Sequence, residues 1–311
     1  MPRTRSPLVN LPGKWKFLKT QHGFRCAPML TLIRLISWAV RCCAQTTVIV
    51  NLRRWNVKMR LPGSWRGLGK FLFVFRENYE PELADLEKLL SPGKTFIDVG
   101  ANFGIYTVVA SKLVGEAGRV IAFEPTAQSF DVLRKNVGLN NFKNVLTFRA
   151  AVSDEPGTGW LYYGTDPVQN SLGKNPCWEA GGEEVVMESL DHVLQQAGVD
   201  RVNVIKIDAE GAEELVLRGA VNLLSSMRPI VIYEVNREAS AHLGLSENGA
   251  TKFLERLGYE FFVHGRPGIA SSERPLAGYF NIVAIPKPLN VSSDCKSEAE
   301  LKDLVMSWKE R

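Results

Sequence analysis

The chain has 311 residues, of which 45% are hydrophobic and 23% charged, so it can bury a full core, and its composition excludes a disordered chain and suits a soluble globular protein. Residues 1–76 hold 15 Lys and Arg and no Asp or Glu, which leaves 23 basic and 33 acidic residues, a net charge of −10, for residues 77–311. A basic arm on an acidic body indicates either an extension that the body partly neutralises or a segment attracted to phospholipid, nucleic acid or a phosphate-bearing substrate.

The cysteines and the hydropathy pattern bear on the compartment. The five cysteines are Cys26, Cys42, Cys43, Cys177 and Cys295. Their odd number and the lack of a CxxC pair indicate reduced thiols in a cytoplasmic protein, not a disulfide framework or a zinc site.

No membrane span is predicted, because the most apolar window, residues 29–50, contains Arg34 and Arg41, and arginine is costly at bilayer depth.

The same window predicts an amphipathic helix. Its polar face holds Thr31, Arg34, Ser37 and Arg41, and its other positions hold Leu30, Ile33, Ile36, Trp38 and Val40. Arginine on the polar stripe is typical of helices that lie in a membrane interface, but packing against the body explains the same pattern. An acid-free N-terminus also resembles an organelle transit peptide, although no cleavage site is marked. Peripheral contact with an anionic membrane through residues 26–44 is therefore one alternative for a cytoplasmic protein.

Short elements precede a regular alternation of strands and helices. Strands are predicted at 46–52, 57–61 and 71–75, followed by a helix at 80–90. Further strands are predicted at 95–99, 119–123, 145–152, 185–187, 202–207, 230–234, 260–263 and 280–284. Further helices are predicted at 105–114, 127–136, 190–197, 213–224 and 250–257, and a charged helical tail from Ser297.

The alternation predicts an α/β fold with a doubly wound, mostly parallel sheet covered by helices. The last two strands lack a long crossover, which predicts an antiparallel strand at the sheet edge. We expect a basic N-terminal extension over residues 1–76, a main domain over 77–290 and a charged tail over 291–311.

The segment 154–180 is too long for a simple connector and is rich in Gly, Pro and Asn. It predicts a binding loop, or otherwise an ordinary packed loop. Its aromatic and amide or hydroxyl side chains suit the faces and hydroxyls of sugars: Trp160, Tyr162, Tyr163, Asn170, Ser171 and Trp178.

A glycine-containing turn follows the first main strand, with the sequence Asp98-Val-Gly100-Ala-Asn102-Phe-Gly104. Gly100 permits backbone angles that a side chain forbids and lets a ligand touch the main chain, and Gly104 allows close approach near the helix start. In an open α/β sheet, ligands bind beyond the C-terminal ends of the strands. The spacing differs from the dinucleotide GxGxxG, and the sequence contains no Walker motif.

The second main strand ends in an acid. Glu124 follows Asp98 by 26 residues and is positioned to accept both hydroxyls of a ribose, while Asp98 could hold an amino group. Together these residues predict an adenosine-type ligand with an amino acid end and no pyrophosphate, which fits S-adenosylmethionine. The alternative is a pair of ordinary turns with a helix-capping acid.

A second polar cluster is predicted at the ends of the strands 202–207 and 230–234. Asp208 and Glu210 follow the first of these strands within the stretch KIDAEGAE. Glu234 and Asn236 share one side of the second strand and lie level with Asp208 if the two strands are neighbours. Lys206 inside a buried strand needs a carboxylate partner. Helix capping is an equally good explanation of the nearby Glu213 and Glu214.

These oxygen-bearing side chains could do either of two jobs. They could bind an acceptor hydroxyl and act as its general base, or they could hold Mg²⁺, which would polarise that hydroxyl. Alignment of the reacting atoms can contribute ~7–11 kcal/mol, whereas a base supplies about two to four decades in rate. We therefore expect placement to dominate, with Asp208 or Glu234 as a helper.

At this point the chain resembles a known family. The stretches that carry the resemblance are 96–106, Glu124-Pro125, Leu190-Asp191, KIDAEGAE at 206–213 and Tyr233-Glu-Val-Asn236. They are similar to the FkbM family of S-adenosylmethionine-dependent methyltransferases over roughly residues 77 to 285. The resemblance implies a class I methyltransferase, Rossmann-like sheet of seven strands with the last one reversed, and methylation of a hydroxyl on a sugar or natural product. It also implies that Glu80 lines the cofactor entrance.

Two other functions are compatible with the basic arm. A nucleic-acid methyltransferase is disfavoured, because base-amine methylation usually shows an Asn/Asp-Pro-Pro-aromatic turn where this chain has Asp208-Ala-Glu-Gly. A membrane-associated adaptor built on a methyltransferase-like body is the second alternative. The acceptor and the oligomeric state are not written in the sequence.

Overall fold

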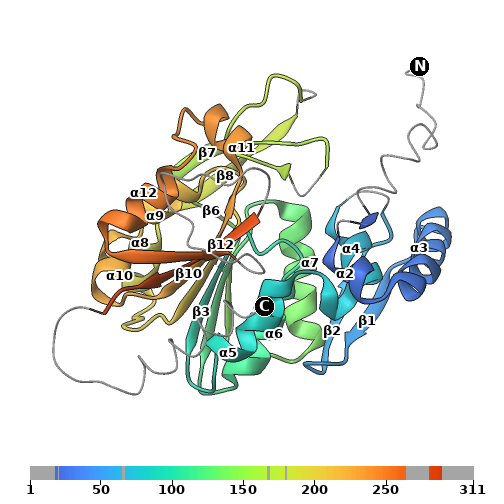
Figure 1. Cartoon of the computed structure of the whole chain (residues 1–311). Coiled ribbons are helices and arrows are strands. Elements are labelled where there is room, and N and C mark those ends of the chain that lie inside the picture. The colour runs from blue at the N-terminus through green and yellow to red at the C-terminus, as the bar shows by residue number, and fades with distance from the viewer. Residues whose placement is uncertain are drawn as a thin grey trace.

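The structure is a computed structural model that describes residues 18–19, 21–64, 67–166, 169–178, 181–263 and 280–288. The predicted tail at 291–311 lies outside these residues. Figure 1 shows a large α/β body with the N-terminal elements packed along one side of it.

The body is built on a seven-stranded sheet with the order β11-β12-β10-β9-β3-β4-β5. The strands are β3 (Thr95–Val99), β4 (Arg119–Phe123), β5 (Val145–Phe148), β9 (Val204–Ile207), β10 (Ile230–Val235), β11 (Tyr259–Val263) and β12 (Phe280–Pro286). β5, β4, β3, β9 and β10 are mutually parallel, and β12 is antiparallel to both of its neighbours. This mostly parallel sheet confirms the predicted class I methyltransferase fold, with the reversed strand one position in from the edge.

Helices cover both faces of this sheet (Figure 1). One face packs against α5 (Pro81–Leu89) and α6 (Ile105–Val114), with α7 (Ala127–Leu139) beside them, and the other against α8 (Leu190–Gln196), α9 (Glu213–Arg218), α10 (Val221–Ser226) and α12 (Gly249–Arg256). Phe96 belongs to the first core and Ile97 to the second, because successive side chains of a strand point to opposite faces. The chain adds strands on one side of β3 and then on the other, so the strand order reverses between β3 and β9. Such a switch point is where α/β sheets bind ligands.

A second sheet forms where the sequence predicts the end of one strand, a loop and a short strand at 185–187, which lies within β8 (Gly182–Glu188). It pairs β6 (Ala151–Val152), β8 (Gly182–Glu188) and β7 (Gly157–Tyr162) in the order β6-β8-β7. The single strand predicted at 145–152 is wrong, because β5 pairs with β4 and β6 pairs with β8 in the other sheet. The predicted loop 154–180 contains β7, which forms an antiparallel pair with β8.

Two other predicted elements are corrected. The strand predicted at 71–75 is the end of a helix, α4 (Leu68–Phe75), in which Leu72, Phe73 and Val74 are all buried. A short apolar run that is buried on all sides has no periodicity that separates strand from helix. The helix predicted at 213–224 is divided into α9 and α10. The Asp191 carboxylate caps α10 by accepting from the backbone N–H groups of Asn222 and Leu223 at 2.8 and 2.9 Å.

The N-terminal extension also contains α2 (His22–Cys26), α3 (Pro28–Cys43), the hairpin of β1 (Val48–Leu52) and β2 (Val57–Leu61), and the 3₁₀ turn η1 (Arg76–Asn78). Trp38 of α3 packs on Phe73 of α4 with their ring centroids 5.1 Å apart. Helix α11 (Arg237–His242) follows β10 in the chain. Within the described residues, no helix has the length and apolarity needed to cross a membrane.

Candidate active site

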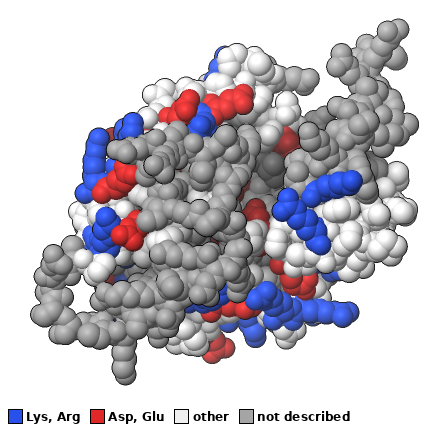
Figure 2. All heavy atoms as spheres, viewed as in Figure 1, with Lys and Arg blue, Asp and Glu red and all other residues white. Residues whose placement is uncertain are grey.

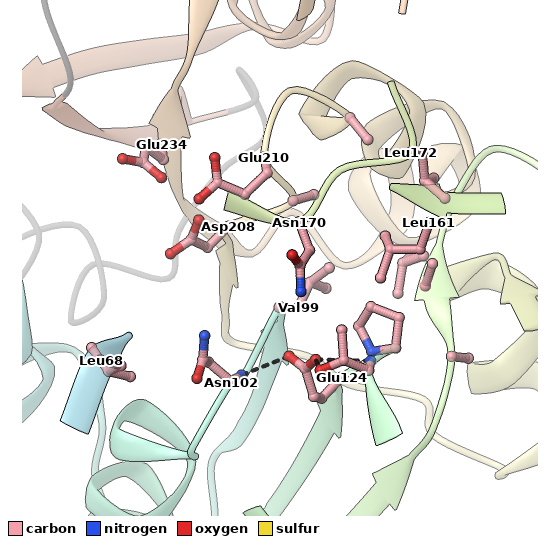
Figure 3. A pocket seen from close by; sticks show the side chains of 18 of the residues that line it. Leu68, Val99, Asn102, Glu124, Leu161, Asn170, Leu172, Asp208, Glu210 and Glu234 are labelled. Carbon is pink, nitrogen blue, oxygen red and sulfur yellow. Dashed lines mark hydrogen bonds between the residues drawn. The ribbon is translucent and has the colours of Figure 1, made fainter. Parts of the chain in front are cut away.

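A cavity of about 230 Å³ opens at the carboxyl ends of the central strands. Val99 and Gly100 line it from the end of β3, Glu124 from β4, Asp208 from β9 and Glu234 from β10. Figure 3 shows the carboxylates of Asp208, Glu210 and Glu234 grouped on one side of this cavity and Asn102 and Glu124 on another. The structure thus brings together the two clusters that the sequence predicts separately.

The glycine-containing turn approaches the neighbouring strand closely. Gly100 has a φ of +76°, and a Cβ at this position would overlap the backbone carbonyl of Asp208. The Asp208 N–H also donates to the Val99 carbonyl at 3.0 Å. Only glycine fits here, because both the backbone angle and the neighbouring strand exclude a side chain. The turn therefore leaves its backbone exposed to the cavity beside Asp208.

Glu124 connects the ends of β3 and β4. One carboxylate oxygen accepts from the Asn102 N–H at 2.9 Å, and the other accepts from the Thr126 N–H at 2.9 Å and its hydroxyl at 2.6 Å. Burial raises the pKa of this carboxyl group to about 6. A carboxylate has about four lone-pair sites, and three are already used. Glu124 has capacity for about one ligand hydroxyl, not the two that the sequence suggests.

Two predicted cofactor residues lie behind the cavity wall. Asp98 is 2% exposed, and its carboxylate accepts from the Thr107 hydroxyl at 2.5 Å, so the structure does not place it against the cavity. Burial raises the pKa of Asp98 to about 6. Gly104 has a φ of +84° and begins α6, where a side chain would overlap Leu133. Both residues support the turn and do not line the cavity.

The acidic cluster of Asp208, Glu210 and Glu234 is compact. Carboxylate oxygens from all three lie within 4.8 Å of one another, so the set is chemically suited to a cation such as Mg²⁺. Glu210 accepts from the Asn236 side-chain amide at 2.9 Å, which explains why Asn236 is near the cluster without lining this cavity. Burial, followed by the charge of Asp208, raises the pKa values of Glu210 and Glu234 well above the ordinary range.

Lys206 places a positive charge beneath this cluster. Its side chain is 2% exposed, and its Nζ lies 3.7 Å from an Asp208 carboxylate oxygen. Asp208 is thus the carboxylate partner that the sequence predicts for this buried lysine. The Nζ also lies 5.6 Å from the ring centroid of Tyr106. Burial alone lowers the pKa of this ammonium group, but the carboxylates of Asp208, Glu80, Glu234 and Asp98 outweigh burial and raise it. Lys206 is therefore a permanent cation at physiological pH.

The N-terminal extension and its junction supply one wall of the cavity. Leu68 and Phe71 of α4 line it together with Tyr79 and Glu80. The Tyr106 hydroxyl donates to Glu80 at 2.6 Å, and burial raises the pKa of Glu80. The sequence singles out Glu80, but α4 is missed as part of the site because it is predicted as a strand.

A second cavity of about 200 Å³ shares Glu210 with the first and is also lined by Asn236. Trp178, Gln169 and Asn175 line it from the predicted binding loop, and Glu238 and His242 from α11. Asn170 of the loop lines the first cavity instead, and the Ser171 hydroxyl donates to the Glu210 carbonyl at 2.7 Å. Trp160 and Tyr163 are 49% and 42% exposed and line neither cavity.

Comparison with known proteins identifies relatives of the body. The family described as "Methyltransferase FkbM domain" matches residues 98–261, more than half of the chain. This range contains the glycine-containing turn, Glu124 and the acidic cluster.

Three curated relatives are 29% identical to this chain. They are methyltransferase sdnD of Sordaria araneosa over 178 residues, hexuronic acid methyltransferase AglP of Haloferax volcanii over 157, and 31-O-demethyl-FK506 methyltransferase FkbM of Streptomyces tacrolimicus over 159. The matches cover 47%, 50% and 42% of this chain. The chain spans 68%, 59% and 60% of the lengths of these relatives.

Solved structures show more distant likenesses. The FkbM methyltransferase of Methylobacillus flagellatus is 14% identical with a TM-score of 0.41, covering 70% of this chain and 54% of its own. An O-methyltransferase of Bacillus cereus in complex with S-adenosylhomocysteine is 16% identical with a TM-score of 0.38, covering 66% and 78%. Because these scores are low, the fold assignment rests on the strand order and the family match.

Proposed function

Because the chain belongs to the FkbM family of S-adenosylmethionine-dependent methyltransferases, we propose that it methylates a hydroxyl group of a carbohydrate or a secondary metabolite. The observation that carries this proposal is the position of the acidic cluster. It borders the same cavity as the glycine-containing turn and Glu124, so a methyl donor held by the turn would face a group of candidate bases.

The cofactor is proposed to lie across the tips of β3 and β4. Gly100 and Asn102 would contact it through the backbone, and the remaining lone pair of Glu124 would accept a ribose hydroxyl. Glu80 and Asp208 would border its amino acid end, where the Lys206 ammonium group offsets part of the negative charge of the carboxylates. Asp98 and Gly104 would act indirectly, by holding the turn in position.

The reaction needs little chemistry from the protein. The methyl group moves from the sulfonium sulfur to the acceptor oxygen, the C–S bond breaks, and the hydroxyl proton passes to a carboxylate, giving an ether and S-adenosylhomocysteine. We assign Glu234 as the proton acceptor, because its raised pKa makes it a stronger base and it lines the cavity. Alignment of the oxygen, methyl carbon and sulfur remains the larger contribution.

The acceptor is proposed to enter through the second cavity. Its lining combines an indole ring with side-chain amides and a carboxylate, a composition suited to the apolar faces and hydroxyls of a sugar. The relatives support this class of acceptor, since one is named for a hexuronic acid and another for an FK506 derivative. Glu210 lines both cavities and is held by the Asn236 amide, so these two residues would orient the hydroxyl.

Calorimetry with S-adenosylhomocysteine tests the cofactor half of the proposal. The native chain should bind it, and Glu124→Gln should weaken binding by roughly 10- to 100-fold, because the amide removes the negative charge and one of the two acceptor oxygens that hold Asn102 and Thr126. Glu184→Gln, at an exposed position on β8, is the matched control and should bind like the native chain. Binding that is the same in Glu124→Gln would contradict the proposed cofactor position.

A further inference from the structure

Helix α3 exposes a continuous apolar stripe. Met29, Ile33, Ile36 and Val40 are 74%, 62%, 70% and 65% exposed, and their spacing of four, three and four residues aligns them along one side of the helix. With Leu30, α3 holds five of the eleven large apolar side chains that are exposed in the described part of the chain. The four aligned residues are called the α3 stripe below.

The opposite face of α3 fixes this orientation. Thr31 and Trp38 are each 1% exposed, and Arg34 donates from its guanidinium to the Val74 carbonyl at 2.9 Å. The Arg41 guanidinium lies over the Phe73 ring, 5.6 Å from its centroid. The arginines of the predicted polar face are therefore turned toward the body. Packing against the body does not account for the apolar residues, because a surface helix normally buries that face.

The charge around α3 indicates what can cover the stripe. The first 76 residues contain 15 basic and no acidic side chains. Arg25 is exposed on α2, which packs against α3. Lys58 and Arg60 are exposed elsewhere on the extension, on β2, which packs against α7. Figure 2 shows Lys and Arg side chains projecting from the side of the molecule where α2 and α4 lie, beside a surface over α3 that carries few charges.

We propose that the α3 stripe inserts into the interface of an anionic phospholipid bilayer and that exposed basic residues of the N-terminal extension attract it there. An apolar face with flanking cations is the combination that binds such surfaces. A second copy of the chain is a less suitable occupant, because pairing through α3 would bring two acid-free basic segments together.

Membrane docking would have a direct consequence for the active site. Trp38 of α3 packs on Phe73 of α4, and Leu68 and Phe71 of the same helix line the catalytic cavity. The docked surface and the cavity wall are thus joined through one helix. A bilayer at α3 would favour acceptors that are themselves presented at a membrane surface.

Vesicle sedimentation of the full chain tests the proposal without relying on methyl transfer. The native chain should sediment with vesicles of phosphatidylcholine and phosphatidylglycerol, more weakly with phosphatidylcholine alone, and less as salt is raised. Ile33→Ser/Ile36→Ser should lower the partition coefficient by roughly tenfold or more. Leu146→Ser/Val186→Ser, which removes two comparably exposed apolar side chains from β5 and β8, should change it by less than about twofold.

Three outcomes would overturn the proposal. The first is a native chain that does not sediment with the mixed vesicles. The second is equal binding by the two double variants, with thermal melts confirming that both are folded. The third is found by light scattering: the native chain is a dimer, Ile33→Ser/Ile36→Ser is a monomer, and both bind vesicles equally. The stripe would then be an interface between copies of the chain.

Discussion

Burial determines the chemistry of the carboxyl groups at this site. Glu210 and Glu234 lie close to Asp208, and each loses water on folding, so their pKa values rise. A carboxyl group with an ordinary pKa is too weak a base to remove a hydroxyl proton efficiently at neutral pH. The environment of the cluster therefore makes these two glutamates better bases than the exposed acids of the surface.

Glu234→Gln should lower kcat by about 10²- to 10⁴-fold, because it removes the proposed proton acceptor but keeps the shape of the side chain. The affinity for S-adenosylhomocysteine should change little. In the native enzyme the rate should rise with pH through the raised pKa of Glu234, and the Gln variant should lose this dependence. Rate measurements across pH on both chains, with Glu184→Gln as control, would contradict the assignment if all three profiles coincide.

Chelation should leave the reaction rate unchanged within about twofold. The Lys206 ammonium group already offsets part of the negative charge of the cluster, and burial raises the pKa values of Glu210 and Glu234, which lowers their tendency to carry negative charge. The measurement is activity before and after dialysis against EDTA. Loss of activity that Mg²⁺ restores would instead assign the cluster as a metal site.

The pH dependence of stability tests how burial changes the pKa of Glu213. Glu213 is 3% exposed, accepts from the Ala209 and Gly211 N–H groups at 3.1 Å, and has a pKa raised by burial from its ordinary value of 4.5 to about 7. Between these two pKa values the folded chain keeps a proton on Glu213 that the unfolded chain has released. Proton binding therefore stabilises the folded chain by about 3 kcal/mol below pH 4.5, and this stabilisation is lost as the pH rises to about 7.

Glu213→Gln should therefore flatten the decline of stability with pH over this interval. Denaturant unfolding at several pH values between these two limits measures the effect. The exposed Glu184→Gln should keep the slope of the native chain. A native slope in Glu213→Gln would mean that Glu213 does not titrate in this interval.

At the scale of elements, Asn136 of α7 and Asn140, which caps the end of that helix, attach the hairpin of the extension to the body. Asn136 is fully buried, and its side chain accepts from the Arg60 N–H at 2.6 Å and donates to the carbonyls of Phe103 and Arg60 at 2.8 and 3.3 Å. Phe103 belongs to the glycine-containing turn. The same side chain thus holds both β2 and the turn of the proposed cofactor site.

Asn136→Ala should lower the free energy of unfolding by about 2–4 kcal/mol, because it leaves buried backbone groups without partners. It should also weaken the binding of S-adenosylhomocysteine, since the turn loses a support. Asn140, one helical turn later, bonds Lys58 in the same way at a more exposed position, so Asn140→Ala should cost less than about 1.5 kcal/mol and leave binding unchanged. Equal costs for the two variants would argue against a special role for Asn136.

At the scale of the whole molecule, the extension and the body share one core. Trp38, Leu52 and Leu72 of the extension pack in the same cluster as Phe96 and Val120 of the sheet. Burying each such side chain contributes about 1.5–3 kcal/mol to stability. Removing a few of these side chains would therefore cost as much as the whole free energy of unfolding of a typical domain, about 5–15 kcal/mol. We propose that the boundary near residue 76 divides composition and charge, not folding units.

A chain that begins at Glu77 should therefore fail to show a cooperative thermal transition and should not bind S-adenosylhomocysteine. It would expose the surfaces of α6 and α7 that β2 of the hairpin covers, and it would lack Leu68 and Phe71 from the cavity wall. Calorimetry of the full and shortened chains makes the comparison. A shortened chain that melts cooperatively within a few degrees of the full one would establish the extension as a separate unit.

The sequence by itself determined the alternation of strands and helices, the turn around Gly100, and the acids at the tips of β4, β9 and β10. These features depend on local patterns: apolar runs of strand length, a glycine where a side chain is forbidden, and acids at strand ends. Parallel strands then bring their carboxyl ends to one edge, so the sequence alone predicts that Gly100, Glu124 and Asp208 lie together, as they do around the cavity.

Only the tertiary structure decided what burial and neighbours control. It made 68–75 a helix although its apolar run suits a strand, turned the arginines of α3 inward, and placed Asp98 behind the wall of the cavity. It also raised the pKa values of Glu210 and Glu234 through residues that are distant in sequence. Each of these outcomes depends on which surfaces lose contact with water, and that is fixed by the packing of the whole chain.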